Sequence, residues 1–135
     1  MMENESITYK LFLSQLKEST YEYDKLIGKL ESVNDFQYIN HSIADKTDKD
    51  DLKEQMKSVD VVVILSGLYS ADKDLIQREI DVAVELGKPI VMIRPYGLET
   101  VPGNIEKKAS EVIGWNAGCI VDSIHESLDE EGYDD

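Results

Sequence analysis

The sequence predicts an α/β fold in which helices cover both faces of a parallel sheet. The main evidence is the stretch from Val59 to Pro95, in which two apolar strands flank a polar loop and an amphipathic helix. Its first strand, Val61 to Leu65, is apolar at every position, as expected of a parallel strand that is covered on both faces. A Gly-Lys-Pro turn precedes the second strand. Strand, helix and strand in this order form a βαβ unit.

The first half of the chain has the same alternation. We expect a first strand from Ile7 to Leu13, which ends at Ser14, and a helix from Thr20 to Leu30 with apolar residues at helical spacing. The next strand, Phe36 to about Ile39, is short and less apolar, which is typical of a sheet edge. A polar loop, Asn40 to Thr47, then leads to a helix whose first turn is acidic, as the helix dipole favours.

The second half supplies the remaining elements. They are, in order, a helix from Leu75 to Leu86, a strand from Ile90 to Ile93, a helix from Pro102 to about Val112, and a loop or short strand from Ile113 to Asn116. Gly118 to Val121 is either a fifth strand or the start of a last helix. Cys119 is expected to pack as a small apolar side chain on a strand.

Strands that alternate with helices through right-handed crossovers give a flavodoxin-like, doubly wound five-stranded parallel sheet with the strand order 2-1-3-4-5. A chain of 135 residues is long enough for a single domain with a proper core and too short for two. We expect the domain to span residues 7–128, after a disordered N-terminus of residues 1–6. Residues 129–135 are expected to form an acidic, disordered tail.

The composition excludes several classes of function. The formal net charge of -14 argues against nucleic-acid binding, which needs clustered Lys and Arg. No apolar run approaches the length of a membrane span, and the N-terminus lacks the pattern of a signal peptide, so we expect a cytoplasmic protein without a membrane partner. The single cysteine permits no disulfide within the chain, and His41 and His125 lack the spacing of metal ligands, so we expect no metal site.

Glu79 is the most informative residue of the sequence. At about 100° per residue, the predicted helix places its apolar residues on one arc, and Glu79 falls inside that arc, between Leu75 and Ala83. A carboxylate at such a position is partly desolvated, which is costly unless it is paired or its pKa rises. Two explanations are open: the carboxylate has a chemical function, or it lies at the edge of the packed stripe and binds a loop amide.

Ligands of doubly wound sheets bind outside the carboxyl ends of the strands, near the point where the strand order reverses. Ser14 and Ser66 end the first and third strands, and the helix that carries Glu79 begins at the same edge. Three other kinds of site are excluded. A receiver domain needs acidic residues at these strand ends, where this chain has Ser14 and Ser66, and a P-loop or dinucleotide fingerprint needs closely spaced glycines, which the segment after Ser14 lacks. Acyl transfer by a serine needs a histidine partner, and none is evident for Ser66 or Ser70. A lone carboxylate beside serines suits cleavage of an N-glycosidic bond, whose oxocarbenium-like transition state it can stabilise.

A family resemblance covers nearly the whole chain. Its centre is the stretch SVDVVVILSGLYSADKDLIQREIDVAVELGKPIVMI, which resembles the core of the TIR fold, in particular the short TIR-like proteins akin to the TIR subunit of the Thoeris antiphage system. The likeness continues through YKLFLS (Tyr9 to Ser14), FQYINHSIADK (Phe36 to Lys46) and VPGNIEKKASEVIGWNAGCIVDSI (Val101 to Ile124). The resemblance implies a flavodoxin-like fold and, in active members, cleavage of NAD at the nicotinamide glycosidic bond.

The resemblance also implies roles for individual residues. The catalytic glutamate of the family, which an aliphatic residue follows, corresponds to Glu79 followed by Ile80. NAD would be the substrate, and no separate cofactor is expected. Binding of the nucleotide is implied for Ser14, Gln15, Ser42, Asp45, Ser66, Tyr69 and Ser70. The loop from Asn40 to Thr47 corresponds to the mobile loop that borders the nucleotide pocket.

The leading hypothesis is therefore an NAD-consuming TIR-like enzyme of antiviral defence, which releases nicotinamide and in some family members cyclises ADP-ribose into a diffusible signal. One alternative is a non-enzymatic TIR-like module that self-associates or docks to an effector protein through the Trp115 region or the loop from Arg94 to Val101. A second alternative is a nucleoside deoxyribosyltransferase-like enzyme, which shares the helix-borne glutamate, although the usual Asp-Gly-Thr stretch is missing here.

Overall fold

The structure is a computed structural model that describes residues 7–132, with side chains described through residue 128. The predictions for residues 1–6 and 133–135 lie outside the described residues. The elements are, in order, β1 (Thr8–Leu13), α1 (Tyr21–Glu31), β2 (Gln37–Asn40), α2 (Lys49–Met56), β3 (Val61–Leu65), the 3-10 helix η1 (Ser66–Ser70), α3 (Lys73–Glu85), β4 (Ile90–Ile93), α4 (Gly103–Glu106), β5 (Glu111–Ile113) and α5 (Ala117–Gly132).

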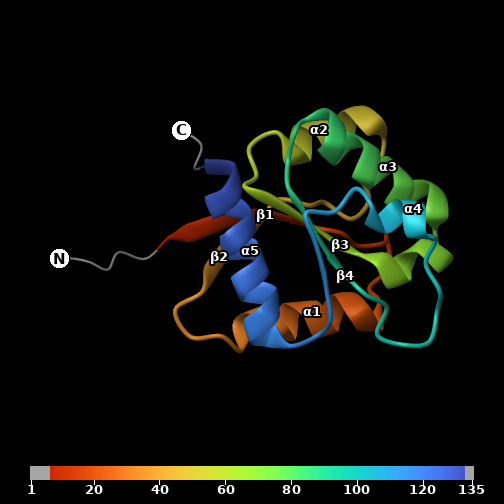
Figure 1. Cartoon of the computed structure of the whole chain (residues 1–135). Helices are drawn as coiled ribbons and strands as arrows, with labels where there is room; N and C mark the ends of the chain where they lie inside the picture. The colour runs from red at the N-terminus through yellow and green to blue at the C-terminus, as the bar shows by residue number, and fades with distance from the viewer. Residues whose placement is uncertain (1–6, 133–135) are drawn as a thin grey trace.

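Five strands form one parallel sheet in the order β2-β1-β3-β4-β5, which confirms the predicted flavodoxin-like topology. Figure 1 shows α1 and α5 on one face of this sheet and α2, α3 and α4 on the other. The strand order reverses between β1 and β3. The carboxyl ends of these two neighbours therefore form the switch point at which ligands of such sheets bind.

The inner strands carry the core. Every residue of β3 and of β4 is buried, because helices cover both faces of these strands. The strand β2 instead alternates exposed and half-buried residues, as expected of the sheet edge that the sequence predicted. None of the described helices is long and apolar enough to cross a membrane.

The segment between β3 and α3 differs from the prediction. Ser66–Ser70 forms the 3-10 helix η1 where a polar loop was expected, and α3 begins at Lys73 rather than at Leu75. The earlier start has a local cause, because the Asp72 side chain accepts a hydrogen bond from the Leu75 N–H at 3.2 Å and caps the helix. The chain thus passes from the central strand into α3 through η1 and a two-residue junction, Ala71 and Asp72.

The predicted helix from Pro102 to about Val112 begins as expected, but its predicted end is wrong. The helix α4 ends at Glu106, and Glu111–Ile113 forms the fifth strand, β5. Strand pairing decides the outcome, because the free edge of β4 offers hydrogen bonds that a helix could not use. The Ser110 N–H donates to the Ile90 carbonyl at 2.8 Å, and the Arg94 N–H donates to the Ile113 carbonyl at 2.9 Å.

The last helix, α5, includes the segment that was left open between strand and helix. Asn116 caps it, because its side-chain oxygen accepts from the Cys119 N–H at 3.0 Å and its carbonyl accepts from the Ile120 N–H at 3.0 Å. Cys119 was expected to pack on a strand, and this prediction is wrong. Cys119 lies on the helix α5 and is exposed. The helix continues to Gly132, so residues 129–132 of the predicted disordered tail are helical.

Gly28→Ala and Gly87→Ala are expected to change the stability in opposite directions. Gly87 follows α3 with a φ of 70°, a conformation that costs other L-residues about 1–2 kcal/mol, so alanine there should destabilise the fold. Gly28 lies within α1, where an added Cβ would meet nothing within 4 Å. Alanine at Gly28 should stabilise the protein by about 0.5–1 kcal/mol through its helix propensity. Urea denaturation measures both effects, and changes of the same sign would contradict this prediction.

Candidate functional site

Glu79 lies in the packed face of α3, as its place in the apolar arc predicted. Its side chain is 2% exposed. Helical side chains point towards the helix N-terminus, and α3 begins at the carboxyl edge of the sheet, so the carboxyl group is directed towards that edge. Its Oε1 atom has no hydrogen-bond partner among the described residues. Among the described residues, no loop amide therefore donates a hydrogen bond to this oxygen, in contrast to the second explanation above.

The pKa of Glu79 is raised well above its usual value of 4.5, mainly because burial disfavours the ionised form. The negative charge of Asp72 raises the pKa further, and the positive charge of Arg78 lowers it. Glu79 thus keeps its proton at pH values at which an exposed glutamate is ionised. Shifts of this kind gather at functional sites, where catalytic groups need them.

Two of the cavities beside α3 are lined by residues that the sequence analysis predicted to bind a nucleotide. One, which we call the Arg78 cavity, has a volume of about 460 Å³ and lies between α3 and the loop of residues 40–47. Its lining consists of Lys17, Ala44, Asp45, Thr47, Asp72, Asp74, Leu75 and Arg78. The other, which we call the Tyr69 cavity, has a volume of about 660 Å³. Its lining consists of residues 69–74 and residues 100–102.

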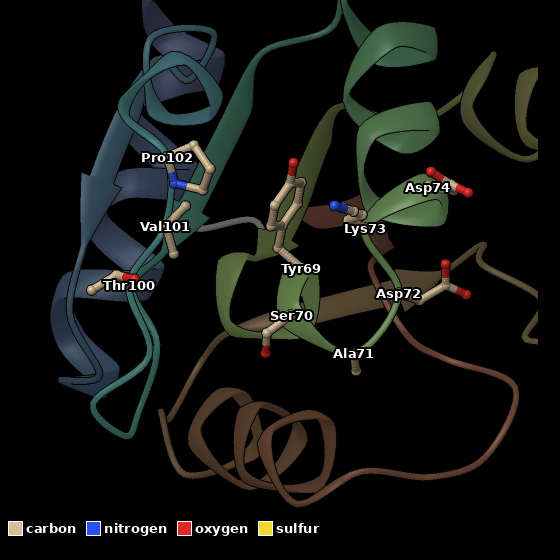
Figure 2. Close-up of a pocket in the computed structure, with 9 residues that line it drawn as sticks. All are labelled: Tyr69, Ser70, Ala71, Asp72, Lys73, Asp74, Thr100, Val101 and Pro102. Atoms are coloured by element: carbon tan, nitrogen blue, oxygen red, sulfur yellow. The ribbon is translucent and has the colours of Figure 1, made fainter.

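Figure 2 shows the Tyr69 cavity between η1, the start of α3 and residues 100–102. The ring of Tyr69 stands between Val101 and Lys73 in this view. The carboxylates of Asp72 and Asp74 point away from residues 100–102. Because both aspartates also line the Arg78 cavity, the first residues of α3 form a wall common to the two cavities.

The loop of residues 40–47 is anchored to α2 and α3 by two side chains. Gln55 of α2, which is buried, accepts from the Ile43 N–H at 2.9 Å and donates to the Lys46 carbonyl at 2.8 Å. Arg78 of α3 donates from Nη1 to the Thr47 carbonyl at 2.9 Å. These hydrogen bonds hold the loop in place over the Arg78 cavity.

The hydroxyl groups of Ser14 and Ser66 take part in structural hydrogen bonds. Ser14 Oγ accepts from the Leu65 N–H at 2.7 Å, and Ser66 Oγ donates to the Ile93 carbonyl at 2.9 Å. Both serines are buried. They therefore join the carboxyl ends of the central strands, and their role in nucleotide binding stays a prediction.

The other predicted binding residues are divided between the two sides of α3. Gln15 donates to the Ser42 hydroxyl at 2.8 Å beside the loop of residues 40–47, and Asp45 lines the Arg78 cavity. Tyr69 and Ser70 line the Tyr69 cavity instead. No group of three or more His, Cys, Asp or Glu side chains that could hold a metal ion occurs in the part of the chain that the structure describes.

The residues at the site that were not found from the sequence include Gln55 and Arg78, which hold the loop of residues 40–47. Gln55 is buried on α2, but it carries no charge, so it gave no signal in the sequence. Arg78 falls on the polar arc of its helix, where a cation is ordinary. Its only signal is that the chain contains two arginines, Arg78 and Arg94, and that one of them precedes Glu79.

Comparison with known proteins identifies the family. A family model described as "Thoeris protein ThsB, TIR-like domain" matches residues 5–100, which is more than half of the chain. The chain belongs to this TIR-like family. No curated protein matches the sequence.

Solved structures are similar to this TIR-like protein in fold. A response regulator from Thermotoga maritima has 11% sequence identity and a TM-score of 0.55, with 90% of this chain and 98% of that chain covered. A de novo designed Rossmann 2x3 fold protein has 17% identity and a TM-score of 0.47, with 92% and 91% covered. The likeness to the response regulator shows the fold alone.

Glu79→Gln is expected to stabilise the TIR-like protein increasingly as the pH rises. The folded state holds the Glu79 proton more tightly than the unfolded state, so the stability of the wild type falls from the usual value of 4.5 up through the raised pKa. Glutamine does not ionise and escapes this loss. The stability difference between variant and wild type should be smallest near pH 4 and larger near pH 8.

Urea denaturation at the two pH values measures this difference. Glu85→Gln is the matched control, because Glu85 is on the same helix and its pKa is lowered by the hydrogen bond from Lys53. Because a lowered pKa means that the charged form stabilises the fold, Glu85→Gln should lower the stability more near pH 8 than near pH 4. A stability difference for Glu79→Gln that does not change with pH would contradict the burial of an ionisable group.

Proposed function

We propose that this TIR-like protein cleaves NAD at the N-glycosidic bond to nicotinamide, with Glu79 as the catalytic carboxylate. The observation that carries the proposal is the buried Glu79 carboxyl, whose Oε1 has no hydrogen-bond partner among the described residues. An unsatisfied buried polar group costs about 1–3 kcal/mol, a cost that packing alone gives no reason to retain. Membership of the family supports the proposal, because the resemblance assigns its catalytic glutamate to Glu79.

The chemistry requires the ionised form of the carboxyl group. As the bond from the anomeric carbon to the nicotinamide nitrogen breaks, its electron pair leaves with nicotinamide and positive charge develops on the ribose. The Glu79 carboxylate stabilises that charge, and a site of low dielectric strengthens the attraction. Because the nicotinamide ring of NAD is itself cationic, bound substrate lowers the pKa of Glu79 towards the ionised form.

The fate of the ribosyl cation determines the product. Attack by water at the anomeric carbon, with loss of a proton, gives ADP-ribose. Attack by a nucleophilic atom of the same ADP-ribose gives a cyclic nucleotide, which can diffuse to an effector protein in antiviral defence. Both products follow from the same departure of nicotinamide, so nicotinamide release reports either reaction.

We place the substrate in the Arg78 cavity. Its volume of about 460 Å³ is within the range of about 300–1,000 Å³ that ligand pockets occupy. Leu75 and Arg78, which line it, are on the same helical turns as Glu79. Glu79 itself is not part of the lining, so on this proposal a movement that exposes the carboxyl group precedes catalysis, and we assign that movement to the loop of residues 40–47.

Glu79→Gln is expected to abolish release of nicotinamide from NAD. Loss of a charge that stabilises a transition state lowers rates by about 10²–10³-fold, although the variant keeps the shape of the side chain. The assay follows nicotinamide at high NAD concentration, with and without a crowding agent that promotes assembly. Glu85→Gln, exposed on the same helix, should keep the wild-type rate.

Equal release by wild type and Glu79→Gln, or none under any condition, would refute the catalytic assignment. Deoxynucleosides with free bases form a further arm of the same assay. Base exchange in that arm, without release of nicotinamide from NAD, would favour the deoxyribosyltransferase alternative.

A second candidate function, assembly through a protein interface, is favoured by an exposed aromatic surface. We define this surface as the exposed residues Tyr21, Tyr96 and Leu98 together with Lys25 and Trp115, which are half-buried. Leu98 is 99% exposed, and Tyr21 and Tyr96 are 65% and 50% exposed. The Tyr96 ring is 5.6 Å from the Tyr21 ring and 5.8 Å from the Trp115 ring, with the Lys25 Nζ 4.4 Å from its centroid. Exposed clusters of this kind mark interaction sites.

Self-association through the aromatic surface should be weakened by Leu98→Ser combined with Tyr96→Ser. Light scattering over a range of protein concentrations is expected to show wild-type oligomers that the double variant does not form. Ile7→Ser is the control, because Ile7 is an exposed apolar residue just before β1, at the amino ends of the strands, whereas Tyr96 and Leu98 follow the carboxyl end of β4. A wild type that stays monomeric at all concentrations would refute self-association through this surface.

A further inference from the structure

Arg78 is a partly buried cation without an acidic partner. In the described part of the chain, ion pairs join Lys49 and Lys53 to Glu85 and Lys57 to Glu54, and none includes Arg78. The chain has 28 acidic and 14 basic residues, so a carboxylate partner for a half-buried guanidinium would be easy to supply. The missing partner suggests that the guanidinium is kept for an anion that is not part of the chain.

The guanidinium of Arg78 is oriented in advance. It has five N–H donors in a fixed plane, and one of them, on Nη1, binds the Thr47 carbonyl at 2.9 Å. This hydrogen bond fixes the plane against the loop of residues 40–47 and leaves the other donors available. A planar fork of donors matches the oxygens of a phosphate, and fixing it beforehand reduces the entropy lost on binding.

The other charged groups of the Arg78 cavity narrow the class of ligand. Lys17 adds a second positive charge, whereas Asp45, Asp72 and Asp74 are exposed carboxylates on the same lining. Carboxylates repel a bare phosphate but accept hydrogen bonds from the hydroxyl groups of a sugar. A ligand that carries both phosphate and ribose therefore fits the lining better than inorganic phosphate does.

We propose that Arg78 binds the diphosphate of a nucleotide in the Arg78 cavity and so determines that the substrate is a phosphorylated nucleotide rather than a nucleoside. This inference rests on the proposed function, since it places the non-reacting half of NAD, and it concerns binding rather than cleavage. In this arrangement Arg78 and Glu79, adjacent on α3, act on two parts of one ligand. Arg78 binds the phosphates, and Glu79 faces the bond that breaks.

Calorimetric titration of the full chain with ADP-ribose tests the inference, because ADP-ribose keeps both phosphates and has no bond to nicotinamide. Arg78→Gln should weaken ADP-ribose binding by about tenfold or more, as expected for the loss of a hydrogen bond to a charged group. Arg78→Lys should restore part of the loss, because it keeps the charge and lacks the fork. Arg94→Gln is the matched control, since it removes the other arginine and lies outside the cavity lining.

Nicotinamide riboside, which lacks phosphates, and inorganic pyrophosphate, which lacks ribose, separate the possible causes. The ratio of ADP-ribose to nicotinamide riboside affinity should fall in Arg78→Gln and stay constant in Arg94→Gln. An equal loss for both ligands would overturn the inference, because it would mean that Arg78 only holds the loop. Pyrophosphate that binds wild type as tightly as ADP-ribose does would overturn the assignment of a nucleotide.

The proposed cleavage and this inference fail in different ways. Binding of ADP-ribose that depends on Arg78, without any nicotinamide release from NAD, would support the binding site and refute the hydrolase. Wild type that does not bind ADP-ribose in the titration would overturn the inference. Increasing salt should weaken ADP-ribose binding more steeply in wild type than in Arg78→Gln, because salt screens the attraction between charges. If Arg78 contributed only an uncharged contact, the two proteins would have the same salt dependence.

Discussion

The hydrogen bond from the Leu65 N–H to the Ser14 hydroxyl joins the ends of β1 and β3, and the arrangement of the site depends on this junction. The two strands are neighbours at the centre of the sheet, but the helices that follow them cover opposite faces. A buried hydroxyl satisfied in this way contributes about 1 kcal/mol, and its loss would leave a backbone N–H unpaired. With the strand ends tied together, η1 and the start of α3 begin from a fixed position.

Two adjacent residues of α3, Arg78 and Glu79, lie in different environments as a result of this fixed start. Arg78 and Glu79 are separated by about 100° around the helix, so the first faces the loop of residues 40–47 while the second enters the packed face. Their opposite charges still interact, because the pKa of Glu79 responds to Arg78. A single helical turn can thus present a cation at the surface of a cavity and a buried carboxyl group beneath it.

The sequence was sufficient for the sheet and for the position of Glu79, because both follow from periodicity. Uninterrupted apolar residues define β3 and β4, and the angular position of Glu79 among apolar neighbours defines its burial. The sequence failed where short-range pattern and long-range pairing disagree, as at β5, whose strand state depends on hydrogen bonds to β4. The contacts of Gln55 and Arg78 with the loop could not be predicted either, since they join residues that only the fold brings together.

The loop anchors also bear on how often the proposed catalytic carboxyl is accessible. Three hydrogen bonds hold the loop of residues 40–47 to the helices: Gln55 accepts one and donates one, and Arg78 donates the third. If each contributes about 0.5–1.5 kcal/mol, opening the two hydrogen bonds of Gln55 costs about 1–3 kcal/mol, and a loop opened there is populated at about 15% to 0.6%, while the hydrogen bond from Arg78 to Thr47 at the end of the loop stays in place. On the proposed function, the basal rate is reduced by that factor. A ligand or partner that binds only the open loop raises the rate by shifting the population, without any change in the chemistry at Glu79.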